Sequence, residues 1–259
     1  MKTAERLASA KRIVVKVGSS SITGENEHNL ALIVDFAAEL RKLAKEVVIV
    51  SSGAIATAAP LMGLTVRSDD LPTSQALASI GQAKLMGRYE SSLARHNLLP
   101  GQILLTVENL DQEQSSINAM RAIERLLEIG VVPIINENDS VATHEIRFGD
   151  NDQLAARVST LAGSDLMVLL SDIDGLYTKP PQDSGAEHIA LVEFGDPLNS
   201  IEVSGTSTGY GTGGALTKLA AARLATTGGV GVILTATANV TKLLDSDCKH
   251  TWFEPNSRV

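Results

Sequence analysis

The densest group of side chains capable of chemistry lies between Val131 and Gln153. Asn136–Asp139, an Asn-Glu-Asn-Asp cluster, follows an apolar run, and Gly149–Asp152 opens a predicted helix a short way further on. Oxygen and amide groups at the carboxyl end of a strand suit a small polar ligand, or the magnesium that accompanies a phosphate. The same residue types also favour a solvated turn followed by a helix cap, so this segment alone leaves both interpretations open.

Two lysines lie in sequence contexts that suit binding of a phosphate. Lys16 lies inside an otherwise apolar run, so its ammonium must find a partner or an anion, or reach past the strand's edge. Gly18–Ser21 follows it and supplies backbone and hydroxyl donors of the kind that cradle phosphate. Lys218 comes at the end of a glycine-rich segment. Both lysines are therefore candidates for neutralising a phosphoryl group.

The glycine-rich segment Gly209–Lys218 formally contains G-x-G-x-x-G. A dinucleotide fingerprint needs an apolar strand before it and an acidic residue about 20 positions later; here no acidic residue follows until Asp245. A Walker A lysine would directly follow the last glycine, whereas Lys218 stands four residues after Gly214. We interpret the segment as a glycine loop that feeds a helix, a geometry suited to a polyphosphate; a flexible surface loop is the alternative.

Two further turns complete the candidate site. Ser51–Ala54 is small and rich in donors, although a simple tight turn explains it equally well. Ser171–Gly175 contains Asp172, which could bind a cation or a nucleotide, or merely cap a turn. Two lysines, two glycine-serine turns, an amide-carboxylate cluster and a glycine loop are what phosphoryl transfer needs. The five histidines occur in no motif with Ser or Cys, so a hydrolase triad has no support.

The elements that must position these residues are predicted from hydrophobic runs. The runs are nearly continuous, as in parallel strands covered on both faces, and helical patterns alternate with them, which predicts an α/β protein with a doubly wound sheet. The expected strands are Ile13–Val17, Val47–Val50, Ile103–Leu105, Val131–Ile135, Leu166–Leu170 and Val230–Leu234. The expected helices are Leu30–Leu43, a stripe from Ile117 to Leu127, and a stripe from Leu154 to Leu161. Lys179–Ser207 is expected to be an excursion or hairpin, and Trp252–Val259 a tail that leaves the domain.

Composition narrows the classes of partner. The 259 residues are 44% hydrophobic but only 3% aromatic, which favours a layered α/β core built from aliphatic residues. The formal charge of −8 argues against a nucleic-acid partner. Cys248 is the single cysteine, so no disulfide framework or zinc spacing exists. No apolar run approaches the roughly 18 residues of a membrane span, and we expect a soluble cytoplasmic protein.

The ordered motifs resemble the amino acid kinase family and, within it, the branch that phosphorylates the side-chain carboxylate of glutamate for proline synthesis. Six segments carry the resemblance: Val15–Ser19, Ser51–Ala56, Ile135–Thr143, Gly149–Asp152, Leu176–Thr178 and Gly211–Lys218. Each is weak alone, but their order is specific. The resemblance implies a three-layer sandwich with a central, mostly parallel sheet flanked by helices on both faces. It also implies ATP as phosphoryl donor, accompanied by Mg²⁺.

The resemblance assigns roles position by position. Lys16 would contact ATP and stabilise the transferred phosphoryl group, Lys218 would do so from the other side, and Asp150 would orient the two lysines. The substrate would be held by Ser52, Asp139 and Asn151, with Asp139 receiving the α-amino group. The nucleotide would be bound by Lys16, Ser171, Asp172, Thr212, Gly213, Gly214, Ala215, Leu216, Thr217 and Lys218. No residue is assigned as a metal ligand.

The resemblance also sets expectations for the chain as a whole. It implies an N-terminal extension (1–11), a kinase domain (12–253) and a C-terminal tail (254–259). Many relatives carry an additional C-terminal PUA domain, related to RNA-modification modules, which this form is expected to lack. Ala215 stands where the family usually has Met, and Ser171 where Thr is more usual; we expect altered loop packing and no loss of activity.

Further expectations concern partners and rival functions. L-Glutamate is the expected substrate, proline a candidate feedback inhibitor, and a homo-oligomer (dimer or tetramer) the expected assembly, with no nucleic-acid or membrane partner. Two alternatives stay open. One is a kinase of the same family that acts on another small acid or a phosphate. The other is a non-catalytic sensor of glutamate or nucleotide.

Overall fold

The computed structural model describes residues 2–65, 70–141, 150–198, 214–245 and 248–257, and of residue 150 the backbone alone. The strands are β1 (Arg12–Val17), β2 (Glu46–Ser51), β3 (Pro100–Leu105), β4 (Val132–Glu137), β5 (Leu166–Ser171), β6 (Leu176–Tyr177), β7 (His188–Ile189), β8 (Leu191–Val192), β9 (Gly231–Ala236) and β10 (Thr251–Phe253). The helices are α1 (Thr3–Ser9), α2 (Asn29–Lys42), α3 (Ala54–Leu61), α4 (Leu71–Ala94), α5 (Val107–Asp111), α6 (Glu113–Glu128), α7 (Asp150–Leu161) and α8 (Ala215–Thr227), with 3-10 turns η1 (Gly24–Asn26) and η2 (Thr237–Lys242).

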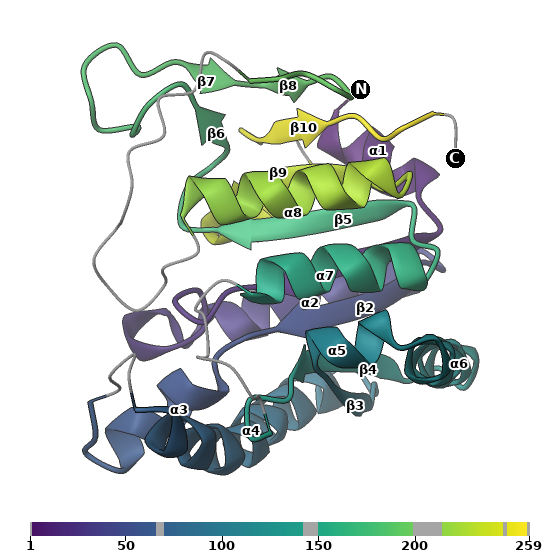
Figure 1. Cartoon of the computed structure of the whole chain (residues 1–259). Helices are drawn as coiled ribbons and strands as arrows, with labels where there is room; N and C mark the ends of the chain where they lie inside the picture. Colours follow the sequence, from purple (N-terminus) through teal and green to yellow (C-terminus); the bar gives the residue numbers. More distant parts are fainter. Residues whose placement is uncertain (1, 66–69, 142–149, 199–213, 246–247, 258–259) are drawn as a thin grey trace.

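The main sheet is mostly parallel. Within the described residues it has eight strands in the order β3-β4-β2-β1-β5-β9-β10-β8 (Figure 1). The six strands from β3 to β9 in this order run parallel to one another, β10 runs antiparallel to β9, and β8 is parallel to β10. A separate antiparallel pair, β6 and β7, flanks part of the predicted excursion.

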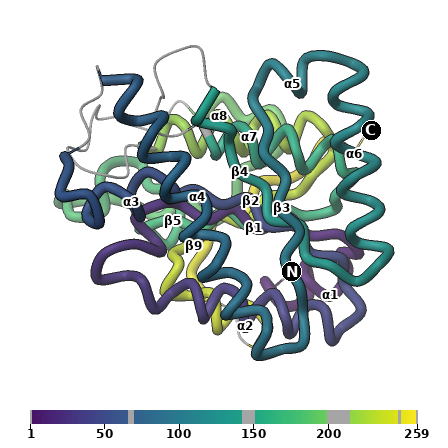
Figure 2. Tube along the Cα trace, turned by 90° about the horizontal axis from the view of Figure 1, so that it is seen from below, coloured from purple at the N-terminus to yellow at the C-terminus, as the bar shows by residue number. Residues whose placement is uncertain are grey.

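Helices cover both faces of this sheet because its central strands are apolar on both sides. Val14 and Val15 are neighbours in β1, yet each belongs to a different core cluster. The cluster around Val15 includes residues of α1, α2, α4 and η2, and the cluster around Val14 includes residues of α6, α7 and α8. Figure 2 shows α7 and α8 on one side of the strands and α2 on the other. The predicted three-layer architecture is confirmed.

Most predicted elements are confirmed within a few residues. All six predicted strands and all three predicted helices are present, and the glycine loop leads into α8. The sequence pattern predicted no helix between Ala54 and Ala94, where α3 and α4 lie. None of the helices in the described ranges is long and apolar enough to cross a membrane.

The expectation that the tail begins at Trp252 is wrong. Trp252 and Phe253 pair with Ile233 and Val232 of β9, so these residues extend the sheet. The ring of Trp252 also receives the guanidinium of Arg6, which lies 3.7 Å from its centroid. The first helix therefore packs on the last strand, and a buried tail strand is favourable because its aromatic surface leaves water.

Helix α4 approaches the turn after β2 more closely than any side chain would permit. A Cβ at Gly81 would lie 1.8 Å from the carbonyl oxygen of Ala54, which is backbone and cannot rotate away. We expect Gly81→Ala to lower the free energy of unfolding by about 1–3 kcal/mol, because the helix must shift. Thermal denaturation would measure this.

Gly87 of the same helix provides a matched control. A Cβ there would meet nothing within 4 Å. Gly87→Ala should raise stability by about 0.5–1 kcal/mol through helix propensity alone. Equal melting temperatures for the two alanine variants would show that the close approach at Gly81 has no energetic consequence.

Candidate active site

The predicted site residues lie along one edge of the sheet. Strands β4, β2, β1 and β5 are neighbours and run parallel, so their carboxyl ends meet there (Figure 1). The turns that follow include Gly18–Ser21 after β1, Ser52 after β2 and Asp172 after β5. Gly53 begins α3 with φ of +109°, a conformation that a side chain disfavours. The chain thereby turns sharply and leaves Ser52 at the edge.

Hydroxyl groups join the turns after β1 and β5. The Ser20 hydroxyl donates to the Asp172 carboxylate at 3.1 Å. The Thr237 hydroxyl, from η2, lies 2.9 Å from Oγ of Ser21 and 3.2 Å from the carbonyl oxygen of Ser171. These contacts fix the donor-rich turn after β1 against the residues predicted to bind nucleotide.

Lys16 and Lys218 converge on one buried carboxylate. Asp152 is 0% exposed, Lys16 5% and Lys218 9%. Oδ1 of Asp152 forms an ion pair with Nζ of Lys16, and Oδ2 accepts a hydrogen bond from Nζ of Lys218 at 3.2 Å. The Thr217 hydroxyl also donates to Oδ2, at 3.2 Å. The carboxylate therefore holds two ammonium groups, one from β1 and one from α8, close to the same point.

Burial and charge act in opposite directions on these groups. Burial alone would raise the pKa of Asp152, but the ammonium groups of Lys16 and Lys218 outweigh it and lower that pKa below 3.8. Burial lowers the pKa of Lys218 below 10.5, and the charge of Lys16 adds to this, while Asp152 opposes it. Asp152 is thus ionised at neutral pH, and Lys218 is a weaker base than a surface lysine. Two cations share one anion, which leaves a net positive charge to meet a phosphate.

The contact with both lysines that the resemblance assigned to Asp150 is made, within the described residues, by a neighbouring carboxylate. Asp152 makes that contact, two residues further along α7. The side chain of Asp150 lies outside the described residues. The role that the resemblance implies for Asp150 therefore stays a prediction.

A signal for Asp152 was nevertheless present in the sequence. Asp152, Ala155, Ala156 and Ser159 recur at helical spacing, and all four are fully buried. A stripe of small residues lets a helix pack closely on the sheet. A carboxylate in line with such a stripe therefore points into the core, towards the end of β1.

The residues predicted to hold the substrate occupy the next part of the edge. The side-chain amide of Asn151 donates to Oγ of Ser52 at 2.8 Å, across 99 residues of sequence. Asp139 lies in the turn after β4 and is partly exposed. Ser52 and Asn151 are thus brought together, while Asp139 stands two residues beyond the end of β4.

The glycine loop is described only from Gly214 onwards. Thr212 and Gly213, predicted to bind nucleotide, lie outside the described residues. Gly214 precedes the first turn of α8, and its carbonyl accepts from the Thr217 hydroxyl at 2.9 Å. Ala215 and Leu216 are exposed at the start of the helix. The amino end of α8 therefore lies at the same edge as Lys16.

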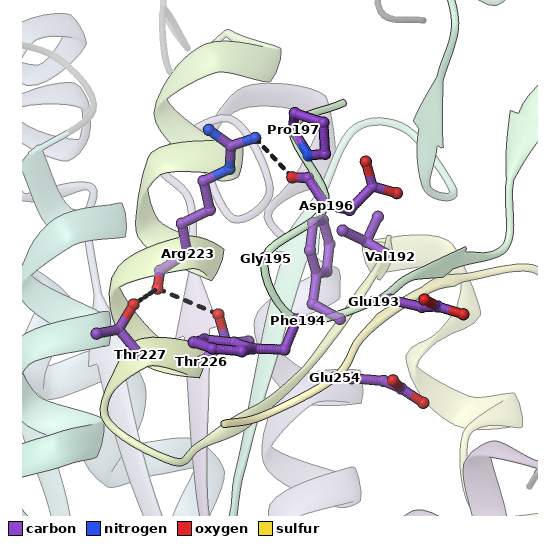
Figure 3. Close-up of a pocket in the computed structure, with 11 residues that line it drawn as sticks. Val192, Glu193, Phe194, Gly195, Asp196, Pro197, Arg223, Thr226, Thr227 and Glu254 are labelled. Atoms are coloured by element: carbon purple, nitrogen blue, oxygen red, sulfur yellow. Dashed lines mark hydrogen bonds between the residues drawn. The ribbon is translucent and has the colours of Figure 1, made fainter. Parts of the chain in front are cut away.

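A cavity elsewhere on the molecule contains none of the predicted site residues. It has a volume of about 280 Å³ and lies between Val192–Pro197 and the carboxyl-terminal half of α8 (Figure 3). Arg223 donates to the backbone carbonyl of Asp196 beside it, at 3.0 Å. Lys218 lies in the first turn of the same helix, and Arg223, Thr226 and Thr227, which line the cavity, lie five to nine residues after it.

Comparison with known proteins agrees with this geometry. Residues 11–235 match the model of the amino acid kinase family. A protein of Clavibacter michiganensis subsp. michiganensis named glutamate 5-kinase is 54% identical over 98% of this chain and 99% of its own length. A protein of the same name from Leifsonia xyli subsp. xyli is 54% identical over 96% of this chain and 93% of its own.

Among solved structures, carbamate kinase from Giardia lamblia bound to AMP-PNP superposes with a TM-score of 0.67. It shares 13% identity and covers 96% of this chain and 100% of its own. At that identity the likeness concerns the fold alone. The family match and the two close relatives go further: the chain belongs to the amino acid kinase family.

Proposed function

We propose that this protein transfers the terminal phosphoryl group of ATP to the γ-carboxylate of L-glutamate. The product would be L-glutamyl 5-phosphate, and the reaction the first step of proline biosynthesis. The observation that carries the proposal is the buried arrangement of Lys16, Asp152 and Lys218 beside Ser52 and Asn151. The relatives named glutamate 5-kinase, matched over almost their whole length, supply the choice of acceptor.

For this reaction the protein mainly has to position the two substrates and stabilise negative charge on the transferring phosphoryl group. A side-chain carboxylate is already ionised at neutral pH, so no general base is needed for its oxygen to attack phosphorus. The bond to the terminal bridging oxygen of ATP breaks as the acyl phosphate bond forms. The ammonium groups of Lys16 and Lys218 stabilise negative charge on the transferring group, and Asp152 holds both in place.

The nucleotide would lie between the turn after β1 and the amino end of α8. Ser171, Asp172 and the segment 212–218 would contact it, with Lys16 and Lys218 at the phosphates. The amino end of α8 offers a helix dipole to an anion. The Giardia carbamate kinase, which has the same fold, is bound to AMP-PNP. That makes ATP the natural donor to test.

Magnesium would enter with ATP. Mg²⁺ binds through substrate phosphates and one or two carboxylates, and keeps several waters. The buried carboxylate of Asp152 is taken up by two ammonium groups, which leaves phosphate oxygens as the main ligands. When bound, the ion would neutralise part of the charge on the phosphates. The lysines would neutralise the remaining negative charge on the transferring phosphoryl group.

The substrate's other groups would be met by Ser52, Asp139 and Asn151. A carboxylate at position 139 suits an α-ammonium, and the amide of Asn151 suits hydrogen bonding to an amino acid backbone. With its α-groups held there, the substrate would have its γ-carboxylate nearer the lysines.

The proposal is tested by glutamate-dependent release of ADP from purified protein with Mg²⁺ and ATP. Hydroxylamine would trap the acyl phosphate as a hydroxamate. Turnover with glutamate, and far less with aspartate or carbamate, is the expected result. Turnover with a different small acid or phosphate would overturn the choice of substrate. Binding of nucleotide and glutamate with no turnover would identify a sensor.

The pH dependence of kcat follows from the lowered pKa of Lys218. The ammonium of Lys218 loses its proton at a pKa below 10.5, so kcat should fall as pH rises through this lowered pKa. Asp152, with its pKa below 3.8, stays ionised throughout the neutral range and adds no acid limb there. In Lys218→Arg the side chain keeps its charge at all accessible pH, so its residual activity should lack this alkaline limb. An identical alkaline limb in both proteins would assign the titration to another group.

We further propose a cytoplasmic protein that assembles as a homo-oligomer and binds no nucleic acid or membrane, with proline as a feedback inhibitor. A formal charge of −8 supports the exclusion of nucleic acid. Light scattering would give the assembly state. Titration of proline into the ADP-release assay would test the inhibition.

A further inference from the structure

Four polar side chains form a continuous chain of hydrogen bonds beside the substrate residues. Nδ2 of Asn136 donates to Oε1 of Gln82 at 2.7 Å. Nδ2 of Asn151 donates to Oδ1 of Asn136 at 3.3 Å and to Oγ of Ser52 at 2.8 Å. Gln82 comes from α4, and Asn136 from the end of β4. The chain of bonds thus links a helix with no predicted role to the predicted substrate site.

One backbone group sets the direction of every bond in this chain. The backbone N–H of Glu137 donates to Oδ1 of Asn136 at 2.8 Å, which fixes that atom as oxygen. Nδ2 of Asn136 must therefore face Gln82, which has to offer its oxygen. Oδ1 of Asn136 in turn requires the nitrogen of Asn151. Both N–H groups of that amide are then used, and its oxygen is the atom left for a ligand.

Two atoms in the chain are buried and unpaired. In the described part of the protein, Oδ1 of Asn151 and Nε2 of Gln82 have no hydrogen-bond partner. Buried polar atoms without partners are rare because each carries a desolvation penalty. An amide oxygen presented next to Ser52 suits a donor such as an ammonium group. The free oxygen of Asn151 therefore points to recognition of an amino group.

Gln82 reaches this position because its neighbour is glycine. The contact between Gly81 and the carbonyl of Ala54 brings α4 against the turn after β2. Asn136 is 1% exposed, so without Gln82 its Nδ2 would be buried with no partner. An amide in that state rotates to find one, and rotation breaks its bonds to Glu137 and Asn151.

We propose that Gln82 is a positioning residue for the substrate. It holds the amide of Asn136, which holds the amide of Asn151, so that the free oxygen of Asn151 faces the amino group of an amino acid. The inference rests on the proposed function, and it adds a determinant of affinity in a helix outside the recognised motifs. Gln82 acts on substrate binding, since its side-chain hydrogen bond within the described residues goes to Asn136 and not to either lysine.

The test replaces Gln82 with Met, which keeps the length of the side chain and removes the acceptor. KM for glutamate should rise about tenfold, as expected when a buried donor loses its partner. KM for ATP and kcat should stay within about twofold. Gln114→Met is the matched control, because Gln114 is exposed on α6 and its side chain bonds only to Asn118 among the described residues. It should leave all three constants unchanged.

A double-mutant cycle identifies the route of the effect. If Gln82 acts through Asn151, then Gln82→Met should have little further effect on KM for glutamate in an Asn151→Ala background. The full tenfold rise in that background would overturn the proposal, as would an unchanged KM in Gln82→Met alone. A parallel loss of kcat and ATP affinity would also overturn it, since that result signals general disorder of the site.

Gln82→Glu covers the case in which the Met variant does not fold. It is nearly isosteric and keeps an oxygen for Nδ2 of Asn136, so KM for glutamate should rise by less than about threefold. A rise of tenfold or more would contradict the proposal.

The proposed function and the role of Gln82 are contradicted by different results. A wild-type protein without glutamate-dependent turnover removes the proposed function, whereas an active wild type with an unaffected Gln82→Met variant removes only the role of Gln82.

Discussion

Asp152→Asn should lower kcat at least about 100-fold, because the two lysines lose the carboxylate that fixes their positions and small displacements of catalytic groups have effects of that size. It should also destabilise the protein. The asparagine side chain keeps the shape of Asp152 but leaves two buried ammonium groups without the carboxylate that pairs with both. Removing one partner of a buried ion pair costs about 3–5 kcal/mol. For a protein of this size that corresponds to a fall in melting temperature of roughly 10 °C.

The destabilisation should depend on pH in a defined direction. Without Asp152, the pKa of Lys218 in the folded protein falls further below its unfolded value, since the carboxylate that raises it most is gone. A lysine pKa that is lower in the folded protein destabilises the fold fully below the folded pKa, and the penalty shrinks as pH rises from the folded pKa to the unfolded pKa. The gap in melting temperature between wild type and Asp152→Asn should therefore narrow as pH rises from neutral towards 10. Calorimetry across that range would measure it.

A surface carboxylate serves as the control for Asp152. Asp111 forms an ion pair with Arg157, and its side chain is 60% exposed. Asp111→Asn should change stability by no more than about 1 kcal/mol and leave kcat intact. A similar loss for both variants would mean that burial of the carboxylate between the lysines is not what matters.

Lys218→Met should lower kcat without lowering the stability of the protein. Its kcat should fall about 100- to 1,000-fold, the range seen when one preorganised group that stabilises transition-state charge is removed. Stability should be unchanged or higher, because Asp152 keeps Lys16 as its partner and a buried cation has been replaced by an apolar chain. Steady-state ADP release and thermal denaturation on the same preparation would give both quantities.

Lys42→Met is the matched control for this variant. Lys42 lies on α2, 64% exposed, and pairs with Glu39 three residues earlier. Its replacement should leave kcat unaltered. Full activity in Lys218→Met would refute the role of this lysine, and a large loss of stability would refute the idea that Asp152 needs only one ammonium partner.

The contrast between the two variants separates two roles within one cluster. Asp152 carries structure and positioning together, so its loss damages both. Lys218 supplies charge to the reaction, and the fold tolerates its removal. A purely structural ion pair would give similar stability losses from either side.

The central layer could be predicted because its sequence signal is local and redundant. Strands such as Val47–Val50 are continuous apolar runs, and the stripe from Ile117 to Leu127 has clear helical spacing. Helix α4 could not be predicted from the sequence, because its buried face includes Ser74, Ala78 and Gly81, which weaken the hydrophobic pattern. Close packing of a helix requires such small residues, so the property that fits α4 to its place also hides it.

In the site, too, residues with a local sequence signal could be predicted and residues placed by tertiary packing could not. Lys16 and Lys218 could be identified because a cation beside apolar or glycine-rich sequence needs an explanation. The motif does not distinguish Asp152 from Asp150, since the phase of α7 depends on tertiary packing that the motif does not contain. Gln82 and Asn136 could not be connected by sequence, because their contact spans 54 residues and joins a helix to a strand.

The packing of α1 against β10 has a consequence for biosynthesis. Thr251–Phe253 supply the neighbour of β9, and Trp252 covers Arg6 of the first helix. While a ribosome is still adding residues, the strand edge of β9 has no partner and the guanidinium of Arg6 has no ring to stack on. Domains made of such distant pairings complete folding late. We therefore expect the emerging chain to depend on chaperone protection until β10 is released, and truncation before Thr251 to yield aggregated protein.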